Sequence, residues 1–332
     1  MTRKLKVLLT GADGMLGASI CRELIHQNYD VVAMILPHSK SQVLHGLKIE
    51  IVRGDVLDRE FLLYVMQECD MVINAAALTN VWPARSNTVM KVNIEGTKNI
   101  MDVAEMYKIE RMVHISSAAS FNQGTKENPG NETNSFNGWK FGLDYVNSKY
   151  LAQEMLLEKY SKDRFPIIII NPTFMIGPFD SGPSSGKIII GLYKNKFPGY
   201  STGGKNFVYS ADVAVAAVNA LSMGRLGECY IAGNENLEYS EFFRKACEVR
   251  NKSFKLIKVP NFIILFVGIM NSMKAIITGK PPGLSYKAAR MASIGQYYSS
   301  AKAQQELKMP QTSITCAVDH CLNWFESNGY LS

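Results

Sequence analysis

The residues best suited to chemistry are a tyrosine and a lysine four positions apart, Tyr145 and Lys149, in the segment FGLDYVNSKYLAQEML. On a helix this spacing puts both side chains on one face. A free phenol is a poor base at neutral pH, but a nearby ammonium favours the phenolate and lowers the pKa of the tyrosine. The pair could therefore move a proton at a substrate oxygen, with Tyr145 as the general acid and base. Tyr150 is the weaker candidate, because no lysine follows it at that spacing.

Such a pair also occurs by chance in many helices, so the segment upstream of it decides. Residues 113–118, VHISSA, are typical of a buried strand that ends in Ser116 and Ser117. The carboxyl ends of the strands in a doubly wound parallel sheet face the ligand crevice. We therefore expect Ser117, with Ser116 as the alternative, to lie beside the tyrosine and the lysine.

A glycine-rich turn near the N-terminus indicates a second kind of site. The apolar run 7–10 leads directly into a G-x-x-G-x-x-G segment and then into an apolar helix. In this context the first glycine permits a tight turn, the second lets a pyrophosphate approach the backbone, and the third lets the helix pack closely on the strand. The free N–H groups at the start of the helix would bind the phosphates. The predicted phosphate-binding residues are Gly11, Asp13, Gly14, Met15, Leu16 and Gly17.

The elements that must position these residues alternate along the first half of the chain. Apolar runs rich in valine and isoleucine predict strands at 6–10, 30–35, 49–53, 71–74, 111–115 and 166–171. Between them, helical patterns predict helices at 14–27, 59–68, 89–107 and 141–159. This alternation predicts an α/β fold, a Rossmann-type doubly wound parallel sheet with a smaller C-terminal lobe.

Glycines and prolines after Asn171 mark a change in organisation. We expect residues 1–172 to form the dinucleotide-binding domain and residues 173–332 to form mainly a substrate-binding lobe. The stretch 206–222 reads as a strand end followed by a helix and is expected to return to the first domain. The run FIILFVGIM at 262–270 is too short to span a bilayer, and we expect a helix or strand of the second lobe. Contact of this run with a membrane surface is the less favoured alternative.

Composition and motif searches exclude several functions. The formal net charge is +7, but lysines and arginines are scattered without a basic stripe, so we expect no nucleic-acid partner. The six cysteines form no C-x-x-C pair, and the sequence has no H-E-x-x-H or comparable metal cluster and no G-x-S-x-G elbow of a hydrolase. The N-terminus begins a strand rather than a signal peptide, so we expect a cytoplasmic protein with reduced thiols and no metal.

Together these motifs resemble the extended short-chain dehydrogenase/reductase superfamily, the NAD-dependent epimerase/dehydratase family, over nearly the whole chain. Further matching segments are Gly54-Asp55-Val56, Ala75-Ala76-Ala77, Val92–Thr97 and the N-P-T pattern at 171–173. The resemblance implies that Asp55 and Val56 border the adenine ring. It also implies that the backbone of Ala75, Ala76 and Ala77, with Pro172, borders the cofactor.

The same resemblance assigns roles near the reacting atoms. It implies that Asn93 lies near the nicotinamide and that Lys149 binds the nicotinamide ribose. It also implies that Ser117 forms a hydrogen bond to the substrate oxygen on which Tyr145 acts. The predicted catalytic residues are therefore Ser117, Tyr145, Lys149 and Asn93.

The choice between NAD and NADP depends on the end of the second strand. An acidic residue there would bind the ribose diol of NAD, and Ile35 occupies that position. Leu36 follows, where relatives that use NADP often have arginine. His38, Ser39 and Lys40 could hold a 2′-phosphate, because cations and hydroxyls donate hydrogen bonds to it, although a polar surface loop is the simpler alternative. In the absence of the acid, the sequence favours NADP over NAD.

The substrate is less well defined by the sequence. Asn206 stands before F-V-Y-S-A-D, where sugar-nucleotide epimerases often have arginine, and residues 173–175 lack a further asparagine of those enzymes. Without the arginine, a diphosphate would lose a bidentate partner. The pattern is closest to dihydroflavonol 4-reductase-like and bacterial 3β-hydroxysteroid dehydrogenase-like proteins.

We therefore predict an NAD(P)-dependent oxidoreductase that transfers a hydride between nicotinamide and a carbonyl or alcohol of a small, hydrophobic substrate. The first alternative is a nucleotide-sugar epimerase or dehydratase with tightly bound NAD. The second is a non-catalytic cofactor-sensing protein, a class that often lacks the tyrosine or the lysine, whereas both are present here. The resemblance also allows a homodimer.

Overall fold

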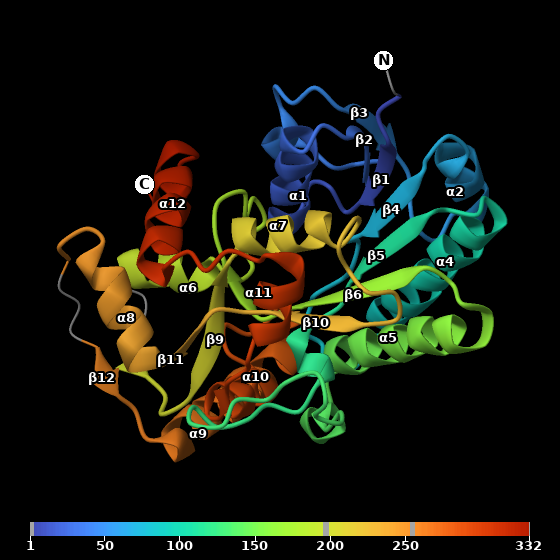
Figure 1. The fold of residues 1–332 in the computed structure, drawn as a ribbon. Coiled ribbons are helices and arrows are strands. Elements are labelled where there is room, and N and C mark those ends of the chain that lie inside the picture. Colours follow the sequence, from blue (N-terminus) through green and yellow to red (C-terminus); the bar gives the residue numbers. More distant parts are fainter. Residues whose placement is uncertain (1–2, 195–198, 253–255, 332) are drawn as a thin grey trace.

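Seven strands form one parallel sheet at the centre of the molecule (Figure 1). The computed structural model describes residues 3–194, 199–252 and 256–331. In spatial order the strands are β10 (Cys229–Ala232), β6 (Ile167–Pro172), β5 (Arg111–Ile115), β4 (Met71–Asn74), β1 (Lys6–Thr10), β2 (Asp30–Ile35) and β3 (Glu50–Arg53). The order of the strands reverses between β1 and β4, so the carboxyl ends of these two strands border the crevice at the topological switch point.

Apolar side chains on both faces explain why these segments form buried strands. In β1, Val7 and Leu9 belong to one hydrophobic core and Leu8 belongs to the other, and all three are fully buried. Successive residues of a strand point to opposite faces, so a run that is apolar throughout suits a sheet covered on both sides. The predicted doubly wound parallel sheet is confirmed. Six of its strands lie within one residue of their predicted ranges, whereas β10 is not predicted from the sequence.

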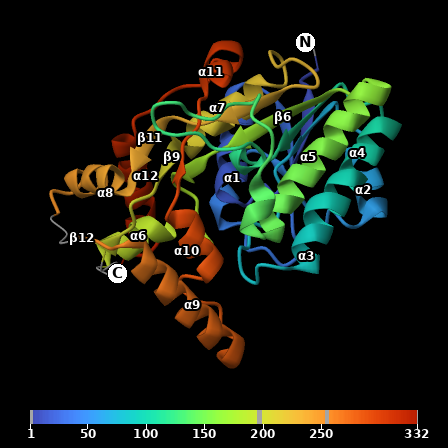
Figure 2. The same ribbon diagram turned by 90° about the horizontal axis from the view of Figure 1, so that it is seen from below.

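Helices cover both faces of this sheet (Figure 2). One face carries α1 (Met15–His26), α7 (Ser210–Asn219) and α11 (Ala301–Leu307). The other carries α2 (Arg59–Met66), α4 (Gly96–Met106) and α5 (Asp144–Asp163). Because α7 packs against α1, the helix within 206–222 lies on the first domain.

Two predicted helices have different bounds in the structure. The helix expected at 89–107 is divided into α3 (Asn87–Met90), a π-helical turn (Lys91–Glu95) and α4. Such π turns are frequent at functional sites, and this one carries Asn93. The helix expected at 141–159 starts later, because a 3-10 turn occupies Gly138–Phe141 before α5 begins.

The second lobe is built on a smaller sheet. Its central strand, β9 (Gly204–Tyr209), pairs with β7 (Phe174–Ile176), β11 (Glu235–Glu238) and β13 (Gly295–Gln296). The strand within 206–222 therefore belongs to this sheet and not to the first domain. The helices α6 (Lys187–Tyr193), α8 (Tyr239–Glu248) and α12 (Ile314–Ser327) enclose a core in which the rings of Phe207 and Phe242 stack with centroids 4.1 Å apart. A short pair, β8 (Gly199–Tyr200) and β12 (Ile257–Lys258), completes this lobe.

A helical hairpin of α9 (Asn261–Thr278) and α10 (Tyr286–Ala292) lies at the periphery of the second lobe (Figure 2). Within the described residues, α9 is the one helix long and apolar enough to cross a bilayer, and only 11% of it is buried. The apolar run at 262–270 is therefore the first half of a longer and largely exposed helix.

Candidate active site

The glycine-rich turn joins β1 to α1 at the switch point. Gly11 has a φ of +67°, and a Cβ atom on Gly17 would lie 2.1 Å from the Gly11 carbonyl oxygen. These two glycines therefore allow the turn and the close packing of the helix. A Cβ atom on Gly14 would meet only that carbonyl, at 3.4 Å, so open space lies outside Gly14. Gly14 also precedes α1 without a capping side chain, and the first N–H groups of the helix, on Met15 and Leu16, suit an anion.

The backbone that follows β4 lies directly beside this turn. The Ala75 N–H donates to the Thr10 carbonyl and the Ala76 N–H donates to Thr10 Oγ1, both at 3.2 Å. Thr10 Oγ1 in turn donates to Asn74 Oδ1 at 2.8 Å. These contacts hold the segment from Ala75 to Ala77 at the edge of the crevice, where the sequence predicts the cofactor.

Asn93 lies behind this edge. Its amide nitrogen donates to the Leu78 carbonyl and to Ser148 Oγ, each at 2.9 Å, and its Oδ1 accepts from the Leu78 N–H at 2.8 Å. Only 2% of the residue is exposed. Both of its amide protons are committed to neighbouring protein groups, and its place near the nicotinamide stays a prediction. It is a positioning residue that ties the backbone beyond β4 to α5.

The loop after β2 carries the residues predicted to hold a 2′-phosphate. The Ser39 hydroxyl donates to the Asp13 carboxylate and joins this loop to the glycine-rich turn, whereas His38 and Lys40 are exposed. Arg53, at the end of β3, donates to two carbonyl oxygens of the same loop at 3.2 and 2.8 Å. The sequence analysis did not single out this arginine, although its position directly before the Gly-Asp pair after the third strand was the available signal.

The remaining predicted adenine and ribose contacts lie along the same edge. Ile35 is buried and Leu36 is exposed, so neither offers a polar group to a ribose. Asp55 accepts a hydrogen bond from the Leu57 N–H at 3.0 Å through one carboxylate oxygen. Val56 is buried against the first turn of α4.

The three other predicted catalytic residues meet where β5 ends and α5 begins. Ser117 is the second residue after β5, and Tyr145 and Lys149 lie on successive turns of α5. The Ser117 hydroxyl and the Tyr145 phenol form a hydrogen bond, and both side chains border a pocket. Lys149 is buried behind them, and its Nζ donates to the Ile115 carbonyl oxygen at 2.7 Å.

The two weaker sequence candidates lie elsewhere. Ser116 is buried and its hydroxyl donates to Gln153 Oε1 at 3.0 Å. The ring of Tyr150 stacks on Phe136 with centroids 4.0 Å apart. Neither Ser116 nor Tyr150 lines the pocket beside Tyr145.

Burial dominates the electrostatics of this group. It raises the pKa of Tyr145, with a smaller opposing effect of the Ser117 hydrogen bond, and it lowers the pKa of Lys149 to about 8. The predicted lowering of the tyrosine pKa by the lysine is therefore wrong for this arrangement, because the phenol is desolvated and the ammonium donates to a backbone carbonyl. Burial, assisted by the Lys149 charge, also lowers the pKa of His114 in β5 well below its usual value, so this imidazole is neutral.

The pocket beside Ser117 and Tyr145 has a volume of about 160 Å³ and takes its walls from both lobes. Drug-sized ligands occupy about 300–1,000 Å³, so this space fits the reacting end of a substrate. Its other walls include apolar Val81, Pro172, Phe174, Met291 and Tyr298 and polar Lys205, Asn206 and Gln296.

Lys205, in β9, is a charged pocket residue that the sequence did not single out. Its Nζ donates to Gln296 Oε1 and lies 5.1 Å from the centroid of the Phe174 ring. Burial lowers its pKa to about 8. Within the described residues no carboxylate pairs with it. Position 206 lacks the arginine of sugar-nucleotide epimerases, but Lys205 brings a cation into the pocket from the preceding position. Asn206 itself accepts a hydrogen bond from Thr173 Oγ1 at 2.8 Å.

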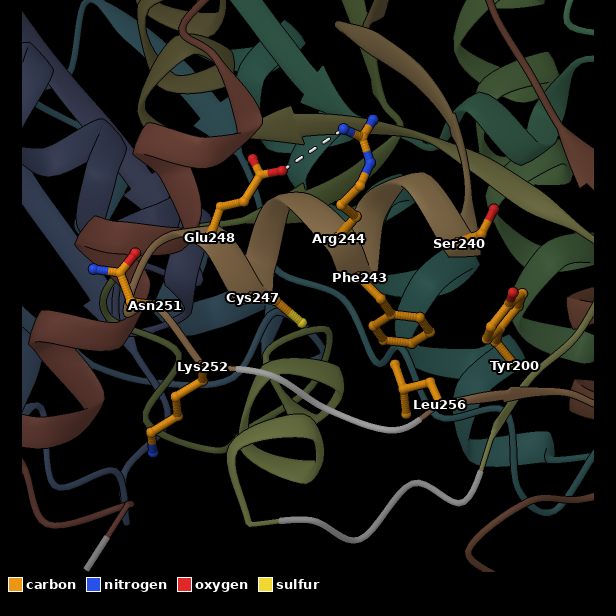
Figure 3. Close-up of a pocket in the computed structure, with 9 residues that line it drawn as sticks. All are labelled: Tyr200, Ser240, Phe243, Arg244, Cys247, Glu248, Asn251, Lys252 and Leu256. Carbon is orange, nitrogen blue, oxygen red and sulfur yellow. Dashed lines mark ion pairs between the residues drawn. The ribbon is translucent and has the colours of Figure 1, made fainter.

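A larger cavity, of about 480 Å³, lies along α8 in the second lobe (Figure 3). Figure 3 shows the side chains of Tyr200, Phe243 and Leu256 gathered at one end of it. Arg244 and Glu248 form an ion pair, at 3.7 Å, on the helix. None of the predicted site residues lines this cavity, so its size alone does not make it the active site.

A family model described as the NAD dependent epimerase/dehydratase family matches residues 7–233, which include the glycine-rich turn and the Ser117, Tyr145 and Lys149 group. The chain belongs to this family. The resemblance to the extended short-chain dehydrogenases and reductases is therefore confirmed, and the chain is an enzyme of this nicotinamide-dependent class.

Similar proteins align over nearly the full length of the chain. The "Putative dihydroflavonol 4-reductase" of Synechocystis sp. is 29% identical, with 97% of this chain and 95% of that protein covered. Sterol demethylase protein B of Methylococcus capsulatus is 25% identical, with 98% and 99% covered. The crystal structure of gox2253 superposes with a TM-score of 0.86 at 27% identity, and covers 99% of this chain and all of that one.

Proposed function

We propose that this enzyme is an NAD(P)-dependent reductase or dehydrogenase that acts on a carbonyl or alcohol group of a small, hydrophobic substrate. One observation carries the proposal: the Ser117 and Tyr145 hydroxyls lie at one wall of a pocket whose other walls include Val81, Phe174 and Met291. A carbonyl oxygen can bind at the hydroxyls while an apolar group packs against the other walls. The names of the two relatives aligned over nearly the whole chain, a dihydroflavonol reductase and a sterol demethylase protein, support a substrate of this kind.

The residues of the chain divide the proton chemistry among them. A bound nicotinamide would supply or accept the hydride. Tyr145 would donate its phenolic proton to the substrate oxygen during reduction and take it back during oxidation. Ser117 would hold that oxygen by a hydrogen bond, and Lys149 would bind the ribose of the nicotinamide, as the resemblance to the family implies.

The residues that border the crevice fit a dinucleotide. Open space outside Gly14 and the uncapped start of α1 suit a pyrophosphate. We propose NADP as the preferred cofactor, because His38, Lys40 and Arg53 lie around the loop after β2 and no acidic residue follows that strand. Cations in this position favour a 2′-phosphate over a free ribose diol.

The first experiment is a fluorescence titration of the purified protein with NADH and NADPH in parallel, after an assay for any nicotinamide that co-purifies. We expect an empty site as purified and tighter binding of NADPH. An Arg53→Ala variant should lose most of this preference, whereas Arg59→Ala, on α2, should keep it. Binding of neither nucleotide would contradict the proposal.

A nucleotide-sugar epimerase or dehydratase is the second candidate, and Lys205 is the observation that favours it. An unpaired cation in the pocket could bind a diphosphate of such a substrate. Tightly bound NAD that survives purification, together with UDP-sugar binding that is lost in Lys205→Met, would support this candidate over the first.

We also propose that the enzyme works in the cytoplasm on a small-molecule substrate without a nucleic-acid partner. The six cysteines are all outside disulfides, as expected in a reducing compartment. Cell fractionation with an assay of activity in each fraction tests this location. Activity confined to a periplasmic or secreted fraction would contradict it.

A further inference from the structure

The helix α9 carries an apolar surface that no part of the described chain covers. Its 18 residues are 11% buried, and its main packing partner is α10. Six of its apolar side chains are at least half exposed, namely Phe262, Phe266, Met270, Met273, Ile276 and Ile277. Figure 2 shows α9 at the edge of the molecule with its outer side open. Soluble monomers seldom leave so much contiguous apolar surface in water, so this face has a partner.

The two faces of α9 differ in side-chain size. The exposed residues Phe262, Phe266, Met270, Met273 and Ile277 follow one another at intervals of three and four, which forms a single stripe along the helix. The buried positions of α9, Gly268 and Ala275, lie on the opposite side, where small residues let α10 approach closely. The sequence pattern therefore places the large side chains of α9 on its outer face and small residues on the face that packs on α10.

The charges around α9 indicate what the partner is. From Val249 to Gln305 the sequence contains no aspartate or glutamate and nine lysines and arginines. Lys258 precedes α9, and Lys274 and Lys280 lie at its far end, all three exposed. No ion pair with a carboxylate is found for these three lysines in the part of the chain that the structure describes. An apolar stripe flanked by cations is complementary to the acyl chains and headgroups of an anionic lipid surface.

Two other occupants fit less well. In a two-fold dimer through this face, each basic surface would meet its own copy, and like charges would face each other. A membrane-spanning α9 would have to leave α10, because Tyr286 N–H donates to Ser272 Oγ at 2.9 Å and Arg290 of α10 donates to the Lys140 carbonyl on the main body at 3.1 Å. An 18-residue helix is also only about 27 Å long, slightly less than a hydrocarbon core of about 30 Å.

We infer that α9 lies flat in the surface of an anionic lipid bilayer, with its apolar stripe among the acyl chains and its flanking lysines on the headgroups. The enzyme would then be a peripheral protein held by this hairpin. The other helix of the hairpin, α10, contributes Met291 to the wall of the reaction pocket. If the proposed function is correct, docking would therefore bring that pocket close to substrates dissolved in the lipid.

Vesicle flotation with the purified full-length protein tests the docking. The probes are vesicles of phosphatidylcholine alone and vesicles of phosphatidylcholine mixed with phosphatidylglycerol. We expect the protein to float with the mixed vesicles, to bind the neutral vesicles more weakly, and to be released in part by high salt, because salt screens the lysine charges. Absence of binding to either vesicle would overturn the inference.

Paired variants locate the contact. Phe266→Ser combined with Ile277→Ser should lower the vesicle partition coefficient about tenfold or more, because two exposed apolar side chains no longer enter the acyl region. Lys274→Glu combined with Lys280→Glu should abolish the preference for anionic vesicles. The controls are Met223→Ser, a half-exposed apolar residue in the turn after α7, and Lys48→Glu, an exposed lysine before β3.

The outcomes separate lipid from protein partners. Unchanged flotation of both α9 variants would overturn the inference, as would a dimer in solution that dissociates in Phe266→Ser/Ile277→Ser while vesicles are not bound by the wild type. NADPH binding and the melting temperature of each variant report whether the fold is intact. Since a soluble carbonyl substrate needs no lipid, its turnover tests the proposed function independently of the docking.

Discussion

Tyr145 and Ser117 are the two hydroxyl side chains that meet at the wall of the reaction pocket, and only one of them sits one turn before a buried lysine. We predict that Tyr145→Phe lowers kcat/KM by about 10²-fold or more, because the substrate oxygen loses its proton donor. NADPH binding should be largely unchanged, since the ring remains in place. The measurement is steady-state turnover together with a cofactor titration.

The control for this substitution is Tyr150→Phe. Its ring stacks on Phe136 outside the pocket, so turnover should stay close to that of the wild type. Turnover like that of the wild type in Tyr145→Phe would remove Tyr145 from the proposed chemistry.

The pKa of Tyr145 has a consequence for the two reaction directions. Because burial raises this pKa, the phenol is protonated at neutral pH and is ready to donate a proton, whereas oxidation requires the phenolate. We predict that kcat/KM for alcohol oxidation rises by roughly tenfold per pH unit between about pH 7 and pH 9, while carbonyl reduction does not rise. Parallel pH profiles in both directions measure this. An oxidation rate that is flat over that range would indicate that another group accepts the proton.

At the level of elements, the glycine-rich turn separates a structural role from a binding role. A Cβ atom on Gly17 would collide with the Gly11 carbonyl at 2.1 Å, so Gly17→Ala should lower the free energy of unfolding by about 1–3 kcal/mol. A Cβ atom on Gly14 has room within the protein, so Gly14→Ala should fold normally but bind NADPH about tenfold or more weakly, because the methyl group occupies the path of the pyrophosphate. Gly182→Ala, which has open space around it, is the control.

Thermal melting and cofactor titration of the three variants distinguish these roles. Equal loss of stability in Gly14→Ala and Gly17→Ala would mean that the turn is structural throughout. Unchanged NADPH affinity in Gly14→Ala would move the phosphate site away from α1.

The sequence predicts the first domain well because its elements are long enough to have a pattern. The buried strands β1, β2, β4, β5 and β6 are mostly apolar runs next to a turn, and chain order alone then implies a parallel sheet. Two strands of the second lobe are too short for this signal, since β7 has three residues and β13 has two. The strand β10, with the sequence CYIA, is also too short to be distinguished from a loop segment by periodicity.

The candidate site follows the same rule. Ser117, Tyr145 and Lys149 lie next to recognisable elements, so their meeting point follows from the predicted sheet. Lys205 and Met291 reach the pocket only because the second lobe folds over the sheet edge, and no local pattern around either residue specifies that contact. The exposure of α9 was unpredictable for a related reason, since an apolar run does not reveal whether other elements cover it.

At the scale of the whole molecule, the reaction pocket is a property of both lobes together. The first domain supplies the hydroxyls, the buried lysine and part of the apolar wall, and the second supplies further wall residues such as Phe174 and Met291 that would select the substrate. The arrangement also keeps Lys149 away from water, with a pKa of about 8 in place of its ordinary 10.5. This lowering of the pKa means that burying the charged ammonium reduces the free energy of unfolding by about 3 kcal/mol, because no carboxylate of the described residues pairs with it.

We therefore expect Lys149 to be needed for activity although its charge destabilises the folded protein. Below about pH 8 the lysine is charged in both the folded and the unfolded chain, so the full penalty is present. Between about pH 8 and pH 10.5 the folded chain loses the proton first, and the penalty fades as pH rises.

We predict that Lys149→Met is more stable than the wild type by about 1–3 kcal/mol near neutral pH. Part of this gain is offset because the hydrogen bond to the Ile115 carbonyl is lost. The variant should also be nearly inactive. Urea unfolding of both proteins near neutral pH and again in alkaline buffer measures the difference, which should shrink at the higher pH. Lys162→Met, on the exposed side of the same helix, should leave the free energy of unfolding little changed. A Lys149→Met variant that is less stable than the wild type near neutral pH would mean that the ammonium stabilises the fold. Lys149 would then be buried for structural reasons and not for catalysis.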